Sequence, residues 1–140
     1  MREIYFAGSI RGGRGDQQLY ATLIDHLQSY GHVLTVHVGD PQLTRKGEEH
    51  LTTQKIYQRD MRWLRKADVF VAEVTTPSLG VGYELGMAEV FGLPTLCLFR
   101  PYGRRTLSTY VSENKHFQVQ TYRKAASALH AIDQFIQTAG

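Results

Sequence analysis

Two acidic side chains occupy positions where a carboxylate is costly unless it is paired or used. Asp60 falls in the middle of the apolar face of a helix expected over residues 51–66, close to Trp63. Glu84 falls in the first turn expected for a helix that follows two glycines, where the helix dipole favours its ionised form. Paired carboxylates can cleave a glycosidic bond, because one attacks or stabilises the sugar carbon while the other handles a proton on the leaving group.

Two glycine-rich loops, residues 8–14 and 75–82, each follow an apolar strand candidate. Backbone N–H groups at such a loop, together with the start of the next helix, form a common binding site for anions. Arg11 and Ser78 add donors that suit a phosphate group. Because Glu84 stands beside the second loop, the pattern indicates chemistry on a bound anion rather than docking alone.

Strand and helix patterns alternate five times along the chain. Strands are expected over residues 3–7, 32–38, 68–74, 95–99 and 117–122, and helices over 19–30, 51–66, 83–91, 107–111 and 124–137. This alternation predicts a single α/β domain over residues 1–140, with a doubly wound (Rossmann-like), five-stranded parallel sheet in the order 2-1-3-4-5, flanked by helices. Strands one and three are neighbours in that order, so a crevice opens at their carboxyl ends, where both glycine-rich loops lie.

The first helix is expected to begin at Asp16 as its N-cap and to end at Gly31. On the helix over residues 51–66, the basic side chains, Arg59 among them, are expected on the side opposite Asp60.

Composition excludes several classes of protein. The chain has 140 residues, a net charge of +3 and one cysteine, Cys97, inside an apolar strand candidate. No apolar run is long enough to span a membrane, and no dense stripe of lysine and arginine suggests a nucleic-acid partner. Disulfides and cysteine-based zinc sites are not expected. We expect a cytoplasmic protein, also nuclear if it is eukaryotic, that uses no metal and no cofactor.

Several alternatives remain at this point. The glycines of residues 80–86 do not have the spacing of a dinucleotide fingerprint, and no Walker motif is present. Asp60 could cap a loop or pair with an arginine, and Glu84 could merely complement the helix dipole. His37, at the end of the second expected strand, could reach the crevice.

Three segments carry a family resemblance. They are Tyr5–Arg14 (YFAGSIRGGR), the Gln58–Asp60 triplet and Pro77–Gly86 (PSLGVGYELG). Together they resemble the nucleoside 2-deoxyribosyltransferase superfamily, and most closely its N-hydrolases that act on 2′-deoxynucleoside 5′-phosphates. The resemblance covers nearly the whole chain.

The resemblance implies a glycosidase that cleaves the N-glycosidic bond of 2′-deoxynucleoside 5′-monophosphates, releasing free base and 2-deoxyribose 5-phosphate. It implies that Glu84 is the nucleophile, which forms a covalent intermediate with the sugar. Asp60 would donate a proton to the base or position it. Tyr5 would hold the nucleophile and would itself lie near C2′ of the sugar.

The same resemblance implies a nucleotide-binding site and a homodimer. Ser78 and Gly80 would bind the phosphate, and Ser108 would come from the neighbouring subunit to complete each site. The rest of the expected substrate-binding set is Gly8, Ser9, Ile10, Arg11, Gly12 and His37.

Three rival functions stay open. A transferase that moves deoxyribose between bases would use the same Glu84, but the phosphate donors favour a phosphorylated substrate. A ribonucleotide N-hydrolase of the CMP type is weakly disfavoured by Tyr5, which would crowd C2′. A non-catalytic nucleotide-binding module is disfavoured by Asp60, because a binder gains little from burying that charge.

Overall fold

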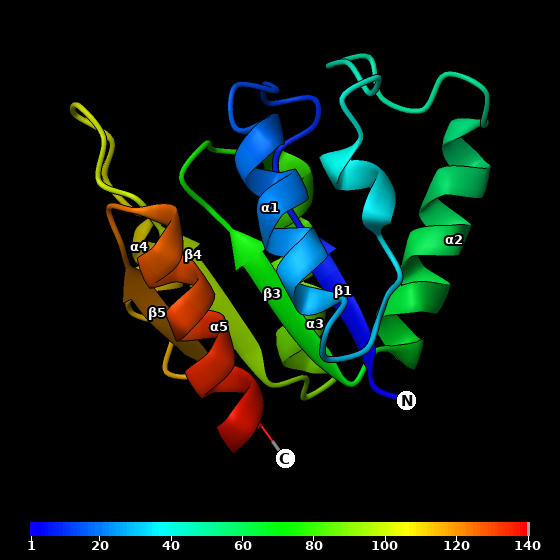
Figure 1. Cartoon of the computed structure of the whole chain (residues 1–140). Coiled ribbons are helices and arrows are strands. Elements are labelled where there is room, and N and C mark those ends of the chain that lie inside the picture. Colours follow the sequence, from blue (N-terminus) through cyan, green and yellow to red (C-terminus); the bar gives the residue numbers. More distant parts are fainter. Residues whose placement is uncertain (140) are drawn as a thin grey trace.

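All strands of the sheet run parallel, in the order β2-β1-β3-β4-β5, which confirms the predicted fold class (Figure 1). The computed structural model describes residues 1–139. The strands are β1 (Glu3–Ala7), β2 (His32–Val33), β3 (Val69–Glu73), β4 (Thr95–Phe99) and β5 (Phe117–Thr121). The helices are α1 (Gln17–Leu27), η1 (Val36–Gly39), α2 (Thr53–Lys66), α3 (Leu79–Val90), α4 (Thr109–Ser112) and α5 (Ala125–Thr138).

Helices cover both faces of the sheet, and side-chain alternation along β1 shows how the layers are divided. Ile4 and Phe6 pack against α1 and α5 on one face, whereas Tyr5 and Ala7 pack against α2 and α3 on the other. Figure 1 shows α1 and α5 in front of the sheet and α3 behind it. Because both faces are buried, β3 and β4 consist mostly of apolar residues, as expected for parallel strands, and Glu73 and Thr95 are their buried polar residues. Cys97 is fully buried in β4.

The second strand is much shorter than the predicted span of residues 32–38. Only His32–Val33 pairs with β1, and Val36–Gly39 forms the short 3₁₀ helix η1. Thr35 explains the early end, because its hydroxyl donates to Phe6 O and accepts from the Phe6 N–H at 3.0 Å. These side-chain bonds take the place of the next ladder bonds, so the chain turns away from the sheet.

The third long helix begins earlier than predicted, at Leu79 rather than Tyr83. Ser78 caps it, since its side chain accepts a hydrogen bond from the Val81 N–H at 3.3 Å. The glycines that suggested a loop lie inside the first helical turns, where the cap and the burial of Val81 and Leu85 outweigh their low helix propensity. Glu84 is therefore in the second turn, and the helix dipole stabilises its charge less than predicted.

The first helix ends at Leu27, before the predicted Gly31. Gly31 serves a different purpose, because a Cβ there would lie 2.3 Å from the Arg2 carbonyl oxygen. Asp16 occupies the N-cap position but makes no capping hydrogen bond. Its carboxylate binds Arg100 instead, at 2.8 Å, which joins the start of α1 to the end of β4.

No helix within residues 1–139 is both long and apolar enough to cross a membrane.

Candidate active site

Tyr5 and Glu84 meet on the α2/α3 face of the sheet. The Tyr5 hydroxyl, at the centre of β1, donates a hydrogen bond to Glu84 Oε2. The Tyr5 ring is 1% exposed and stacks on Phe70 of β3, with ring centroids 5.2 Å apart, so the phenol has little freedom to move. Residues 79 positions apart thus form one rigid pair.

The pKa of Glu84 is raised to about 7: burial is the main cause and the negative charge of Asp60 adds to it, while the hydrogen bond from Tyr5 opposes the rise. Burial also raises the pKa of Tyr5, as do the charges of Glu84 and Asp60, so this phenol keeps its proton. The site therefore holds a carboxylate that is easily protonated near neutral pH beside a permanent hydrogen-bond donor.

Asp60 approaches the same group from α2 and is half-buried. Arg59 donates to its Oδ1 from Nη2 at 2.9 Å and from Nε at 3.1 Å. Burial raises the pKa of Asp60, and this outweighs the opposite effect of the Arg59 hydrogen bond and charge. Both predictions for Asp60 thus have a structural basis, since it pairs with an arginine and also lies beside the candidate nucleophile.

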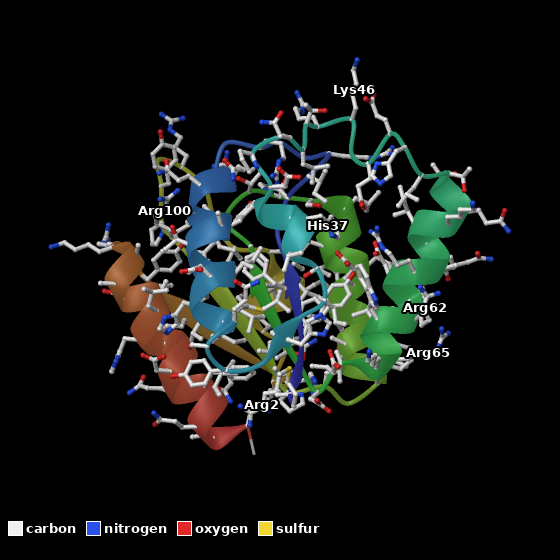
Figure 2. All side chains as sticks on the ribbon, turned by 45° about the vertical axis from the view of Figure 1, so that its right-hand side comes forward. Arg2, His37, Lys46, Arg62, Arg65 and Arg100 are labelled. Carbon is white, nitrogen blue, oxygen red and sulfur yellow. The ribbon has the colours of Figure 1, made fainter. Side chains whose placement is uncertain are left out.

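Arg59 and Glu48 belong to this site but were not identified from the sequence. Arg59 was predicted on the opposite side of the helix from Asp60, and that prediction is wrong. Its guanidinium folds back over the Trp63 ring, 4.5 Å from the centroid, and binds Glu48 as well as Asp60. Arg62, by contrast, is exposed on the outside of α2, and Arg65 lies over the Phe91 ring, 5.6 Å from its centroid (Figure 2). A long flexible side chain can leave the helix face on which its Cα lies.

His37 lies close to this charged group, on η1 rather than on a strand (Figure 2). Its Nε2 is 3.4 Å from Glu48 Oε1, and its ring is 6.1 Å from that of Trp63, centroid to centroid. Burial lowers the pKa of His37, although Glu48 opposes this effect. The structure therefore brings His37 to the site edge, as the sequence suggested, by a different backbone path.

The two glycine-rich loops touch each other at Gly12. A Cβ at Gly12 would lie 2.4 Å from the Pro77 carbonyl oxygen and 2.8 Å from Ser9 Oγ. Ser9 itself is fully buried, and its N–H donates to the Tyr20 hydroxyl at 3.1 Å. A Cβ at Gly8 would press on the same Tyr20 ring, at 2.9 Å. Gly12 is thus required for the close approach of the loops.

We expect Gly12→Ala to lower the free energy of unfolding by about 2 kcal/mol, because the loops must separate to admit the methyl group. Thermal or urea unfolding measures the change. Gly15→Ala is the matched control, since nothing lies within 4 Å of a Cβ at that position. Equal stability of the two variants would contradict the proposed contact.

The candidate phosphate donors lie on the first glycine-rich loop and at the start of α3. Ser78 caps α3, and Gly80 is exposed in the first turn, where helix N–H groups have no partner within the helix. Arg11 is exposed, and its Nε lies 3.6 Å from the position of a Cβ on Gly47. Ile10 is partly buried against the core. Ser78 and Gly80 therefore offer hydroxyl and N–H donors at the start of the helix that carries Glu84.

A buried acid, Glu73, supports the second loop from beneath. Its carboxylate accepts hydrogen bonds from the Thr75 N–H at 2.9 Å, from the Thr75 hydroxyl at 2.8 Å and from the Tyr122 hydroxyl. Thr75 Oγ1 also accepts from the Arg100 N–H at 2.9 Å. Burial raises the pKa of Glu73, and the hydrogen bonds from Tyr122 and Thr75 oppose that effect. The loop is therefore held in place at the ends of β3, β4 and β5.

Ser108 is not part of this group within one chain. It is exposed and caps the short helix α4, where its Oγ accepts from the Tyr110 N–H at 3.3 Å.

Residues 1–139 contain no cluster of three or more histidine, cysteine or acidic side chains arranged to hold a metal ion.

Comparison with known proteins identifies the family. The model of the nucleoside 2-deoxyribosyltransferase family matches residues 4–130. The 5-hydroxymethyl-dUMP N-hydrolase of Mus musculus is 54% identical over 123 residues, which cover 85% of this chain and 71% of that protein. The 5-hydroxymethyl-dUMP N-hydrolase of Danio rerio is 51% identical over 138 residues, covering 96% of each chain.

A solved structure shares the fold at much lower sequence similarity. A CMP N-glycosidase from Clostridium botulinum superposes with a TM-score of 0.69 and 17% identity, covering 95% of this chain and 99% of that one. The match of the family model over most of the chain, and the high identity to two N-hydrolases, agree with the resemblance of the three motifs. The chain belongs to the nucleoside 2-deoxyribosyltransferase family.

Proposed function

We propose that this protein hydrolyses the N-glycosidic bond of 2′-deoxynucleoside 5′-monophosphates to free base and 2-deoxyribose 5-phosphate. The observation that carries the proposal is the pair of partly buried carboxylates, Glu84 and Asp60, with the Tyr5 hydroxyl fixed on Glu84. The names of the relatives, which are N-hydrolases of a deoxynucleotide, support the same chemistry.

In the first step a Glu84 carboxylate oxygen attacks C1′ of the sugar and forms a C1′–O bond. The N-glycosidic bond breaks, its electron pair leaves with the base, and Asp60 donates a proton to the base nitrogen. Tyr5 holds the Glu84 carboxylate in one orientation by its hydrogen bond to Oε2. A fixed nucleophile needs little reorganisation on the way to the transition state.

In the second step water attacks C1′ from the face that the base has left. Asp60, now ionised, accepts a proton from that water, the C1′–O bond to Glu84 breaks, and the carboxylate is restored. The sum of the two steps adds one water molecule across the N-glycosidic bond. The chain's own residues thus account for both proton transfers.

The 5′-phosphate is proposed to bind at the start of α3. Ser78 and the Gly80 N–H are suitable hydrogen-bond donors, and Arg11 supplies a positive charge. Binding energy from the phosphate can then orient C1′ against Glu84, which lowers the barrier of the chemical step. Base-exchange enzymes that accept free nucleosides have no need of such donors.

A substrate panel tests the proposal. The enzyme is incubated separately in water with 5-hydroxymethyl-dUMP, dGMP, dCMP, CMP and deoxyguanosine, the last also with free adenine as an acceptor base, and the products are separated by chromatography. We expect release from deoxynucleoside monophosphates alone, and 5-hydroxymethyl-dUMP is the first candidate because the relatives are named for it. Release from CMP, base exchange on deoxyguanosine, or no release from any compound would each reject the proposal in favour of one rival function.

The activity should depend on pH through Glu84. Its pKa is raised to about 7, so kcat/KM falls as the pH drops through 7 and the nucleophile gains a proton. In Tyr5→Phe the carboxylate loses a hydrogen bond that lowers its pKa, so this acid limb should move to higher pH by about one unit. A pH–rate profile of both proteins measures the shift. An acid limb that stays in place would contradict the role of Tyr5.

We further propose that the protein is a homodimer with Ser108 contributed to the neighbouring site. The outer face of α3 is apolar and strongly exposed, at 94% for Leu79, 52% for Tyr83 and 73% for Val90, with Gly86 between them. These positions are separated by four, three and four residues, so they lie along one stripe of the helix, as in helices that pack against each other. A second copy on this face would cover these side chains beside the Glu84 of each subunit.

Mixing two inactive variants tests the shared site. Glu84→Ala and Ser108→Ala remove groups that the proposal places in the same site from different subunits. After co-refolding, a quarter of the sites in a random mixture should recover both groups, and activity should exceed that of either variant alone. Activity that never exceeds the better single variant would contradict the contribution of Ser108.

A further inference from the structure

One arginine side chain joins the candidate proton donor to an acid on a distant loop. Arg59 Nη1 donates to Glu48 Oε2 at 2.8 Å, and Nη2 donates to Glu48 Oε1 at 2.6 Å. The same Nη2 also donates to Asp60 Oδ1 at 2.9 Å, and Nε donates to that oxygen at 3.1 Å. A single positive charge is therefore shared by two carboxylates, one of which is bound in the bidentate manner.

Arg59 binds Glu48 more strongly than it binds Asp60. The two side chains of the Arg59–Glu48 pair are only 15% and 11% exposed, so their attraction is weakly screened by solvent. An arginine stays protonated under all ordinary conditions, so its positive charge is always present and acts on both Glu48 and Asp60. The stronger its link to Glu48, the less it favours the ionised form of Asp60.

Asp60 therefore titrates inside a small set of charged and polar groups. They come from each element packed around it: Arg59 on α2, Glu48 on the loop before α2, His37 on η1, Glu84 on α3 and Tyr5 on β1. Of this set, Glu48 is the acid bound directly to the arginine that also binds Asp60.

We propose that Glu48 is a positioning residue for the reaction: by neutralising Arg59 it keeps Asp60 able to hold the proton that the leaving base needs. The inference rests on the proposed function, in which Asp60 is the proton donor. It assigns a catalytic consequence to a loop acid that touches neither Glu84 nor Tyr5 by any hydrogen bond within the described residues.

Glu48 can be changed without releasing its loop, because the loop has a second anchor. Arg14 Nε donates to the Leu43 carbonyl at 3.0 Å, and Arg14 Nη2 donates to the Asp40 carbonyl at 3.0 Å. A glutamine at position 48 also keeps a carbonyl oxygen that accepts from Arg59. Glu48→Gln therefore removes a charge and retains most of the shape.

In Glu48→Gln the full charge of Arg59 acts on Asp60 and favours its ionised form. We expect the alkaline limb of the kcat/KM profile, which follows loss of the Asp60 proton, to move to lower pH by about one unit and the maximum to fall about tenfold, because fewer molecules hold the proton on Asp60. Glu49→Gln is the matched control, since Glu49 is the next residue on the loop and is exposed. It carries the same change in net charge and should leave the profile in place.

Removing the positive charge instead, in Arg59→Gln, should shift the pH dependence in the opposite direction. In Arg59→Gln, Asp60 loses its positive partner while Glu48 stays negative, so the alkaline limb should move to higher pH. In the double variant Glu48→Gln/Arg59→Gln both charges are gone, and the profile should return close to that of the native protein. A purely structural role of the pair would lower activity in all three variants without opposite shifts along the pH axis.

A measurement that needs no turnover keeps this inference separate from the proposed function. The side-chain carboxyl of Asp60 is followed by carbon-13 NMR during a pH titration, with Asp60→Asn to assign its signal. Its midpoint should fall in Glu48→Gln, rise in Arg59→Gln and stay unchanged in Glu49→Gln. An Asp60 midpoint that does not respond to Glu48 overturns the inference even if the enzyme is active. A responsive midpoint in a protein that releases no base would instead reject the proposed function.

Discussion

Glu84→Ala is expected to lower kcat by at least about 10⁴-fold, since it removes the group that forms the bond to C1′. The affinity for nucleotide should change little, because the proposed phosphate donors lie at Ser78, Gly80 and Arg11. Turnover is measured by base release, and affinity by calorimetry with a deoxynucleoside monophosphate. Glu84→Gln, which preserves a hydrogen-bond acceptor for Tyr5, should be equally inactive and guards against a folding defect in the alanine variant.

Glu89→Ala is the control on the same helix, because Glu89 is exposed and faces Asn114 rather than Tyr5. A direct test of the covalent step is intact-protein mass spectrometry of the 15.9 kDa chain after an acid quench during turnover. The native protein should show an added mass of one deoxyribose phosphate unit, and Glu84→Gln should not. Turnover of Glu84→Ala within tenfold of the native rate would overturn the assignment of the nucleophile.

Asp60→Asn is expected to lower kcat by about 10²–10⁴-fold, the usual contribution of a general acid. The loss should depend on the leaving group. A base needs a proton to depart, whereas a nitrophenolate does not. For a 2-deoxyribose 5-phosphate that carries nitrophenolate at C1, Asp60→Asn should therefore lower kcat much less. Comparison of the two substrates in steady-state kinetics measures this difference.

Asp25→Asn is the control for Asp60→Asn, since Asp25 is exposed on α1. If Asp60→Asn slowed both substrates equally, Asp60 would serve to orient the sugar rather than to protonate the base.

The sequence predicted the fold well because the central strands are buried on both faces. Such strands must be continuous apolar runs, and β1 and β4 begin and end at the predicted residues. The alternation with helices then allows few topologies, and the observed strand order is the predicted one. The contact of Tyr5 with Glu84 follows from that order, because β1 and β3 are neighbours and α3 follows β3.

The errors arose where side-chain bonds compete with local pattern. Thr35 ends β2 by binding the Phe6 backbone, and Ser78 starts α3 before its glycines. Neither bond leaves a periodic signal. The pairing of Arg59 with Glu48 could not be predicted either, because it depends on how the ten residues between them place the loop against α2. The path of a loop and the direction of a long side chain depend on tertiary contacts, which a short stretch of sequence does not reveal.

The position of Trp63 gives the protein a built-in optical reporter. It is the only tryptophan in the chain. The Arg59 guanidinium lies 4.5 Å from its ring centroid, and the His37 ring lies 6.1 Å away. Indole emission is sensitive to nearby cations and is quenched by protonated imidazole. Occupancy of the site by a nucleotide, and the ionisation of His37, can therefore be followed by intrinsic fluorescence, without a label and without turnover.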